Sequence, residues 1–230
     1  MKVSTIILNS DNRDIKKTLA SVGFCDEVIV WQKPVDGNWA AARNEAKATA
    51  KNDWVLFVDS DEMVTRELKD EIQKLSEGDG DGIEGYYLKR RDVFWGWELK
   101  HGEVGNVKLL RLGNKNAGNW VRRVHEFWDI KNARVLKNPL RHYPHQTVRE
   151  FITSINFYTD IDADELYKDG KKVTFFRLIA NPLGKFLRNY FLNFGFLDGP
   201  PGFVYAFLMS FHSLTVRVKM AAKYGFSGLF

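Results

Sequence analysis

Apolar and polar residues alternate along the first part of the chain in the way typical of an α/β fold. Apolar runs at residues 1–8, 27–31 and 54–58 predict three strands. The third run is apolar throughout, which is typical of a strand buried on both faces of a parallel sheet. Residues 14–22 and the Ala-rich stretch 38–50 predict helices between these strands. The chain is therefore expected to open as β-α-β-α-β.

The pattern changes after the third strand. Residues 65–75 predict an amphipathic helix, because Leu68, Ile72 and Leu75 lie on one face, and an Asp/Gly loop follows at residues 78–82. Shorter strands, some of them antiparallel, are expected at residues 86–88, 108–112 and 134–136.

The C-terminal third of the chain has a helical pattern. Phe151 and Ile155 begin an i, i+4 repeat, and the Asn-Pro pair at residues 181–182 and the Gly-Pro-Pro-Gly run at 199–202 predict breaks between at least three helices. We therefore expect an α/β domain over residues 1–147 followed by a helical extension over 148–230.

Length and cysteine content are consistent with this organisation. A chain of 230 residues holds one α/β domain with a substantial core and a smaller appendage. Its single cysteine, Cys25, excludes an internal disulfide and suits a reducing cytoplasmic compartment. The N-terminal apolar run is too short for a signal peptide and has no small-residue cleavage site.

Charge is concentrated in the extension. The net charge is +5, yet residues 171–230 contain eight Lys or Arg and one acid, Asp198, interleaved with many Phe. Amphipathic helices of this composition lie on anionic membrane surfaces, and the apolar stretch 203–216 is too short to span a bilayer. We expect a peripheral protein on the inner, cytoplasmic face of the cell membrane. A helical subdomain packed on the catalytic core is the alternative. Nucleic acid is not an expected partner, because no nucleic-acid-binding module accompanies the cations.

Two carboxylates follow the third strand directly. Asp59 and Asp61 stand at i and i+2 where the apolar run ends, a place where α/β sheets bind ligands. In an extended chain these side chains point the same way, so both can meet one hard divalent cation on a diphosphate. The spacing suits Mn²⁺ and Mg²⁺ equally. An ordinary solvated turn is the alternative for such a pair taken alone.

Several motifs in order resemble the inverting glycosyltransferases of family 2, which have the GT-A fold, and especially the small bacterial enzymes of lipopolysaccharide core synthesis. The resemblance extends over most of the chain and rests on residues 25–30, Ala41-Ala42-Arg43-Asn44, residues 57–62, Val124-His125-Glu126, residues 140–143 and residues 195–199.

The resemblance implies a nucleotide-sugar site. It assigns Asp59, Ser60 and Asp61 to the metal and the sugar nucleotide, and Arg43 and Asn44 to the nucleotide. In the first loop, Ser10 and Asp11 stand where the family usually has an Asn-Glu pair. The segment after residue 31 is shorter than in relatives, so Gln32 or Asp36 would replace a missing aspartate of the base pocket. Arg122 and Arg123 are candidates for holding the diphosphate.

The resemblance also assigns the catalytic base. Glu126 matches the Glu of the family's V-H-E segment and would deprotonate the acceptor hydroxyl. His142 or His125 is a candidate third metal ligand, with a structural histidine as the alternative. Trp95, Trp97 and Trp120 are candidate platforms for a sugar ring, or plain core residues.

The expected function is metal-dependent, inverting transfer of a hexose, namely glucose from UDP-glucose, to a saccharide or lipid-linked acceptor in cell-surface glycan synthesis. A non-catalytic, membrane-peripheral protein that binds sugar nucleotides or glycans is one alternative. A sugar-phosphate nucleotidyltransferase is another, although the Gly-rich basic loop expected after its first strand is replaced here by residues 9–13.

Overall fold

A computed structural model describes residues 1–75, 82–123, 126–145 and 147–225. These residues form two compact units, which we treat separately. The first unit comprises residues 1–91 and 107–143, and the second comprises residues 92–106 and 144–230. The domain boundary expected between residues 147 and 148 stays a prediction. The packing adds residues 92–106 to the unit that contains the C-terminal helices.

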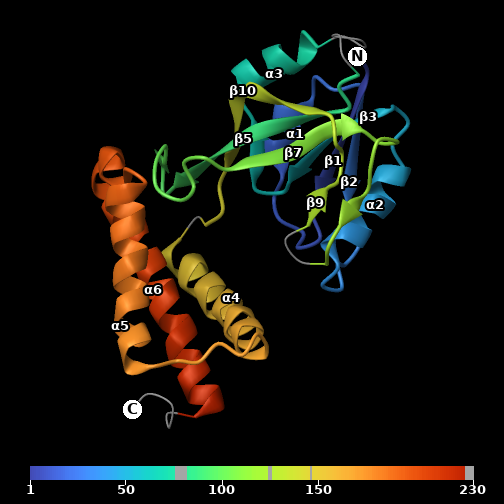
Figure 1. Ribbon diagram of the computed structural model, residues 1–230. Coiled ribbons are helices and arrows are strands. Elements are labelled where there is room, and N and C mark those ends of the chain that lie inside the picture. The colour runs from blue at the N-terminus through green and yellow to red at the C-terminus, as the bar shows by residue number, and fades with distance from the viewer. Residues whose placement is uncertain (76–81, 124–125, 146, 226–230) are drawn as a thin grey trace. The chain divides into compact units, whose positions relative to one another are not determined.

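The first unit is built on a mixed sheet (Figure 1). Its strands lie in the order β2-β1-β3-β7-β5-β10-β4, with β6 paired to β5 alone. Strand β1 pairs in parallel with both β2 and β3, and β7 continues the sheet antiparallel to β3. The strands of this sheet are β1 (Val3–Leu8), β2 (Glu27–Trp31), β3 (Trp54–Asp59), β4 (Glu62–Val64), β5 (Gly85–Phe94), β7 (Lys108–Asn114) and β10 (Ala133–His142). Strand β6 (Trp97–Glu98) and the end of β5 from Asp92 belong to the second unit.

Helices cover both faces of the sheet. The helices of the first unit are α1 (Lys16–Val22), α2 (Trp39–Ala48) and α3 (Arg66–Gln73). Alternate residues of β3 enter different apolar clusters: Leu56 packs with Leu68 of α3, whereas Phe57 packs with Ala46 of α2. All four are fully buried. The sequence prediction of a central strand buried on both faces is thereby confirmed.

A two-stranded ribbon lies outside the main sheet. Strand β8 (Trp120–Val121) pairs antiparallel with β9 (Phe127–Trp128). Trp120 and Trp128 stack at a centroid distance of 5.5 Å, and Phe57 meets both rings edge-on. These apolar contacts fix the ribbon against α2 and β3.

The second unit is mainly helical. Its elements are α4 (Val148–Lys168), α5 (Phe175–Leu187), the π-helix η1 (Arg188–Leu192), the 3₁₀ helix η2 (Gly195–Asp198) and α6 (Gly199–Tyr224). A buried aromatic and aliphatic cluster joins the β5–β6 hairpin to α4 through Phe94, Phe151 and Ile155. The predicted helical extension is confirmed.

One predicted break is wrong. Helix α5 continues through Pro182, although proline removes a helix hydrogen bond and strains the preceding turn. The packing of α5 along α6 overrides this local penalty, and the Ser210 hydroxyl donates to the Pro182 carbonyl at 2.7 Å. The second predicted break, at residues 199–202, becomes the first turn of α6. The break itself lies just before it, in η2.

Two further observations complete the fold. Among the described residues, no helix has the combined length and apolar character needed to cross a bilayer. The Asp/Gly loop predicted at residues 78–82 falls almost wholly outside the described part of the chain.

Candidate active site

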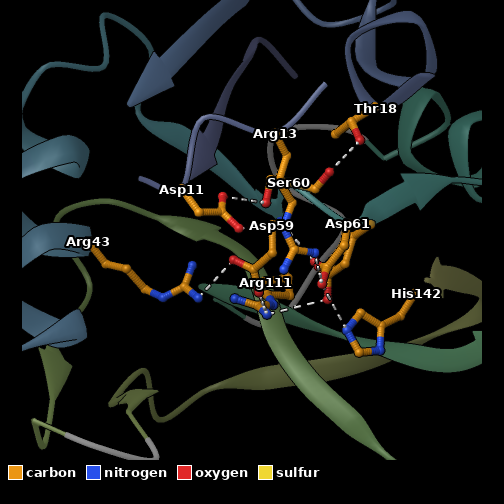
Figure 2. A network of polar contacts seen from close by, with 10 residues as sticks. Asp11, Arg13, Thr18, Arg43, Asp59, Ser60, Asp61, Arg111 and His142 are labelled. Carbon is orange, nitrogen blue, oxygen red and sulfur yellow. Dashed lines mark hydrogen bonds and ion pairs between the residues drawn. The ribbon is translucent and has the colours of Figure 1, made fainter. Parts of the chain in front are cut away.

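The acidic turn lies at the carboxyl end of the two central parallel strands. Asp59 is the last residue of β3 and pairs in register with Leu8, the last residue of β1. The Ser60 amide continues this contact by donating to the Leu8 carbonyl at 3.1 Å. The loop after β1 therefore lies against the Asp59–Asp61 turn, as Figure 2 shows for Asp11 and Arg13.

Two arginines engage the carboxylate of Asp59. Arg43 of α2 donates to Asp59 Oδ1 at 2.9 Å, and Arg111 of β7 donates to Asp59 Oδ2. The Asp59 side chain is 28 % exposed, whereas both arginine side chains are almost completely buried. Each Asp59 oxygen is thus paired with an arginine. Asp59 could bind a metal ion directly only if one of these two ion pairs broke.

A second buried carboxylate supports this contact. Glu62, in β4, is fully buried; it accepts from the Asp59 amide at 3.0 Å and from Arg111 at 3.4 Å. Glu126 accepts from Arg43 Nε at 3.1 Å. We call Arg43, Asp59, Glu62, Arg111 and Glu126 the arginine–carboxylate network.

Burial and charge act against each other in this network. Burial raises the pKa of the Asp59 carboxyl, but the Arg111 and Arg43 charges outweigh it and hold this pKa below its usual range. Burial raises the pKa of the Glu62 carboxyl, and the nearby Asp59 charge adds to this effect against Arg111. The two neighbouring carboxyls thus have pKa values shifted in opposite directions, down for Asp59 and up for Glu62.

Asp61 has different surroundings. Its Oδ2 lies 3.4 Å from Arg13 Nη1 and 3.6 Å from His142 Nε2 (Figure 2). His142 is the last residue of β10, which pairs with β4, and the Tyr143 amide donates to the Asp61 carbonyl at 2.8 Å. The structure thus brings the predicted pair Asp61 and His142 together, although they are 81 residues apart in sequence.

The donor chemistry of this pair suits a divalent cation only in part. A carboxylate and an imidazole are acceptable ligands for Mn²⁺, and Mg²⁺ commonly takes one or two carboxylates plus substrate phosphates. Across residues 1–75, 82–123, 126–145 and 147–225, however, no three His, Cys, Asp or Glu side chains are grouped as a ready metal site. A cation held here would need further ligands from a bound diphosphate or from water.

The remaining predicted residues fall into two groups. Asp11 pairs with Arg13 and accepts weakly from the Ser60 hydroxyl at 3.5 Å, so the first loop does reach the turn. Asn44 does not face the turn: both polar atoms of its side chain bind the Trp120 backbone, at 2.8 and 2.9 Å. The structure gives Asn44 the role of holding β8.

Four other predicted site residues make no contact with the arginine–carboxylate network within the described part of the chain. Gln32, Arg122 and Arg123 are exposed, and Ser10 is half-buried in the turn after β1. The guanidinium of Arg122 lies over the Phe127 ring at 5.4 Å. His125 lies outside the described residues.

The three candidate tryptophans differ in burial. Trp120 is 5 % exposed and lies under the Arg43 guanidinium at 4.7 Å, so it is a core residue. Trp95 stacks on Phe94 in the second unit, and Trp97 is 65 % exposed. Trp97 alone has a face open to a ligand.

Sequence reasoning missed two members of the network, Arg111 and Glu62, as well as the loop residue Arg13. Arg111 is the one charged residue inside the apolar run Leu109–Leu112, and a buried charge in a strand requires a partner. Glu62 follows the acidic pair directly. Both signals can be read from the sequence. The contacts of Arg111 with Asp59 and Glu62, however, depend on the pairing of β3 with β7.

Curated relatives carry glycosyltransferase names. An uncharacterised glycosyltransferase of Rickettsia typhi is 27 % identical over 222 residues, covering 90 % of this chain and 73 % of that protein. The lipopolysaccharide core biosynthesis glycosyltransferase LpsC of Rhizobium meliloti is 26 % identical over 240 residues, covering 88 % of each.

Among solved structures, a fragment of S. aureus TarS, residues 1–349, aligns with a TM-score of 0.40 at 12 % identity, covering 97 % of this chain and 91 % of that one. A likeness at that TM-score carries no weight in the assignment.

The family assignment rests on the sequence of the first unit. Residues 6–143, more than half of the chain, match the family described as Glycosyl transferase family 2. The predicted fold class, an α/β GT-A domain with a helical, basic and aromatic C-terminal extension, is confirmed. The chain belongs to glycosyl transferase family 2 and is a glycosyltransferase.

Proposed function

We propose that this protein transfers a hexose, namely glucose from UDP-glucose, with inversion to a saccharide or lipid-linked acceptor. The observation that carries the proposal is the Asp59–Asp61 turn at the carboxyl ends of β1 and β3, where open α/β sheets bind ligands. The nucleotide would lie along this edge, between the first loop and α2.

In this proposal the two aspartates have separate roles. Asp61 and His142, 3.6 Å apart and partly exposed, would hold Mn²⁺ or Mg²⁺ together with the donor diphosphate. The cation supplies positive charge to the leaving diphosphate, where charge accumulates in the transition state. Asp59, fixed by Arg43 and Arg111, presents its partly exposed carboxylate as an acceptor for donor hydroxyl groups.

Glu126 is the proposed base. Its side chain is 17 % exposed, and its ion-pair partner, Arg43, is shared with Asp59. The shared arginine places Glu126 near Asp59, where a base would take the proton of the attacking acceptor hydroxyl. Arg122 and Arg123 are exposed nearby in sequence and would offer cations to the diphosphate.

The proposed acceptor class follows from the named relative. LpsC is called a lipopolysaccharide core biosynthesis glycosyltransferase, and its similarity extends over 88 % of both chains. We therefore infer a cell-surface glycan acceptor at the inner face of the membrane.

The second unit supports a membrane-peripheral location in this proposal. Helix α5 has no buried residue and exposes an apolar stripe, with Phe176 at 77 % and Leu183 at 53 %. Residues 170–197 contain five Lys or Arg and no acid. An exposed apolar stripe with surrounding cations suits an anionic lipid surface.

Donor screening tests the proposed activity. The full chain is incubated with UDP-hexoses, an acceptor glycan and Mn²⁺ or Mg²⁺, and UDP release and product anomer are measured. We expect release with a UDP-hexose, loss on chelation and loss in Asp61→Ala, with Asp70→Asn on the exposed face of α3 as a carboxylate control. Undiminished turnover in Asp61→Ala would exclude the metal role. Binding of UDP-hexose without any turnover would favour a non-catalytic binding protein.

A further inference from the structure

The second unit contains a polar cavity of about 280 Å³. It lies between the loop 99–106 and the junction of α5 with η1. Its lining side chains are all polar: Glu103, Asn106, Lys185, Arg188, Asn189 and Asn193. Cavities that bind small ligands have volumes from roughly 300 Å³ upward, so this one suits a ligand the size of one sugar ring.

The wall of the cavity is built on irregular backbone. Arg188 and Asn189 belong to the π-helix η1, and π-helical turns occur frequently at functional sites. Gly102 has φ of 72° and donates from its amide to the Asn193 carbonyl at 2.9 Å. Phe194, which follows, also has a left-handed φ of 59°. Glycine adopts such a φ without strain, so Phe194, next to the lining residue Asn193, is the locally unfavourable residue of this segment.

Within the described part of the chain, two lining side chains each have one polar atom without a hydrogen-bond partner. Asn189 is 2 % exposed; its Oδ1 accepts from the Glu103 amide at 2.7 Å, but its Nδ2 has no hydrogen-bond partner. Glu103 Oε2 pairs with Lys185, whereas Glu103 Oε1 has no partner. Both atoms are enclosed by protein atoms, so the side chains that a ligand in the cavity reaches first are the exposed Asn106 and Arg188.

The chemistry of the wall selects the ligand. The exposed Asn106 amide both donates and accepts, as a sugar hydroxyl does, and the exposed Arg188 donates, so neighbouring hydroxyls of a sugar match these lining side chains. A phosphate would match Lys185 and Arg188, but it would also face the Glu103 carboxylate. A nucleobase would find no aromatic ring among the lining side chains.

We propose that this cavity binds a saccharide unit through its hydroxyl groups, apart from the nucleotide-sugar site in the first unit. That the saccharide is the acceptor of the transferase rests on the proposed function. The binding itself does not, because it needs neither donor nor turnover.

Saccharide binding is measured by ligand-observed NMR on the full chain without any nucleotide. The probes are methyl glucoside and methyl mannoside, with inorganic phosphate titrated separately. We expect glycoside binding in the millimolar range. Asn106→Ala and Arg188→Ala are expected to weaken it about fivefold each, as loss of one hydrogen bond predicts. Both residues are exposed, so these variants should fold.

Arg177→Ala is the matched control, because Arg177 is an exposed arginine of α5 that does not line the cavity. It should leave glycoside binding unchanged. Absence of glycoside binding to the intact protein would overturn the proposal, as would equal binding in all variants. Phosphate binding that is weakened by Arg188→Ala, without glycoside binding, would identify an anion site instead. None of these results depends on hexose transfer, so the proposed function is tested separately.

Discussion

Replacement of Arg111 by Met is the sharpest test of the arginine–carboxylate network. Met fills similar space in the strand but removes the cation that contacts both Asp59 and Glu62. Asp59 keeps Arg43 at 2.9 Å, whereas the Glu62 carboxyl keeps only its hydrogen bond from the Asp59 amide among the described residues. The variant therefore leaves a fully buried carboxyl beside a carboxylate.

The expected loss of stability is large. Breaking a buried ion pair by removing one partner typically costs about 3–5 kcal/mol in the free energy of unfolding. Part of this cost is avoided if Glu62 takes up a proton, because burial already raises its pKa. The double variant Arg111→Met, Glu62→Gln should accordingly recover about 1–3 kcal/mol relative to Arg111→Met alone.

The pH dependence has a definite sign. Without Arg111 the pKa of Glu62 rises further, and a group with a raised pKa in the folded state loses its stabilising effect as the pH increases through that value. The deficit of Arg111→Met should therefore be larger at about pH 8 than at about pH 5.

Urea unfolding of the three proteins at both pH values measures these differences. A deficit below about 1 kcal/mol in Arg111→Met would show that the buried contacts are not those described. If adding Glu62→Gln to Arg111→Met recovers no stability, Arg111 does not stabilise the Glu62 carboxyl.

Three further predictions concern other parts of the chain. Glu126→Gln should abolish transfer while UDP-hexose binding persists; near-normal transfer would move the base elsewhere. Asn44→Ala should lower the free energy of unfolding by about 1–3 kcal/mol in urea, because two backbone groups of buried Trp120 lose their partner, and an unchanged midpoint would contradict this. The full chain should sediment with anionic liposomes, less so at high salt and in a Phe176→Ser, Leu183→Ser variant. Equal sedimentation of that variant would exclude the α5 stripe as the contact.

Much of the first unit was predictable because its signals are local. The five-residue apolar run before Asp59 identifies a buried strand and its end, and the Ala-rich stretch identifies α2. The resemblance then placed Arg43 and Glu126 in one site, and the structure puts them 3.1 Å apart.

The contacts that complete the network were not predictable in the same way. Arg111 reaches Asp59 because β7 pairs antiparallel with β3, and the sequence does not encode that pairing in any local pattern. The hydrogen bonds of Asn44 were not predictable for the same reason, since its partner Trp120 lies in a ribbon 76 residues away. In α5, packing along α6 outweighed the local effect of Pro182.

The most direct test of the proposed donor site is a titration of UDP into the full chain with and without Mn²⁺, followed by calorimetry. Intact protein and Asp70→Asn should bind UDP far more tightly with Mn²⁺ than without it, and Asp61→Asn should lose that enhancement. Equal UDP affinity in Asp61→Asn, with the same dependence on Mn²⁺, would contradict the assignment of the Asp59–Asp61 turn to the donor diphosphate.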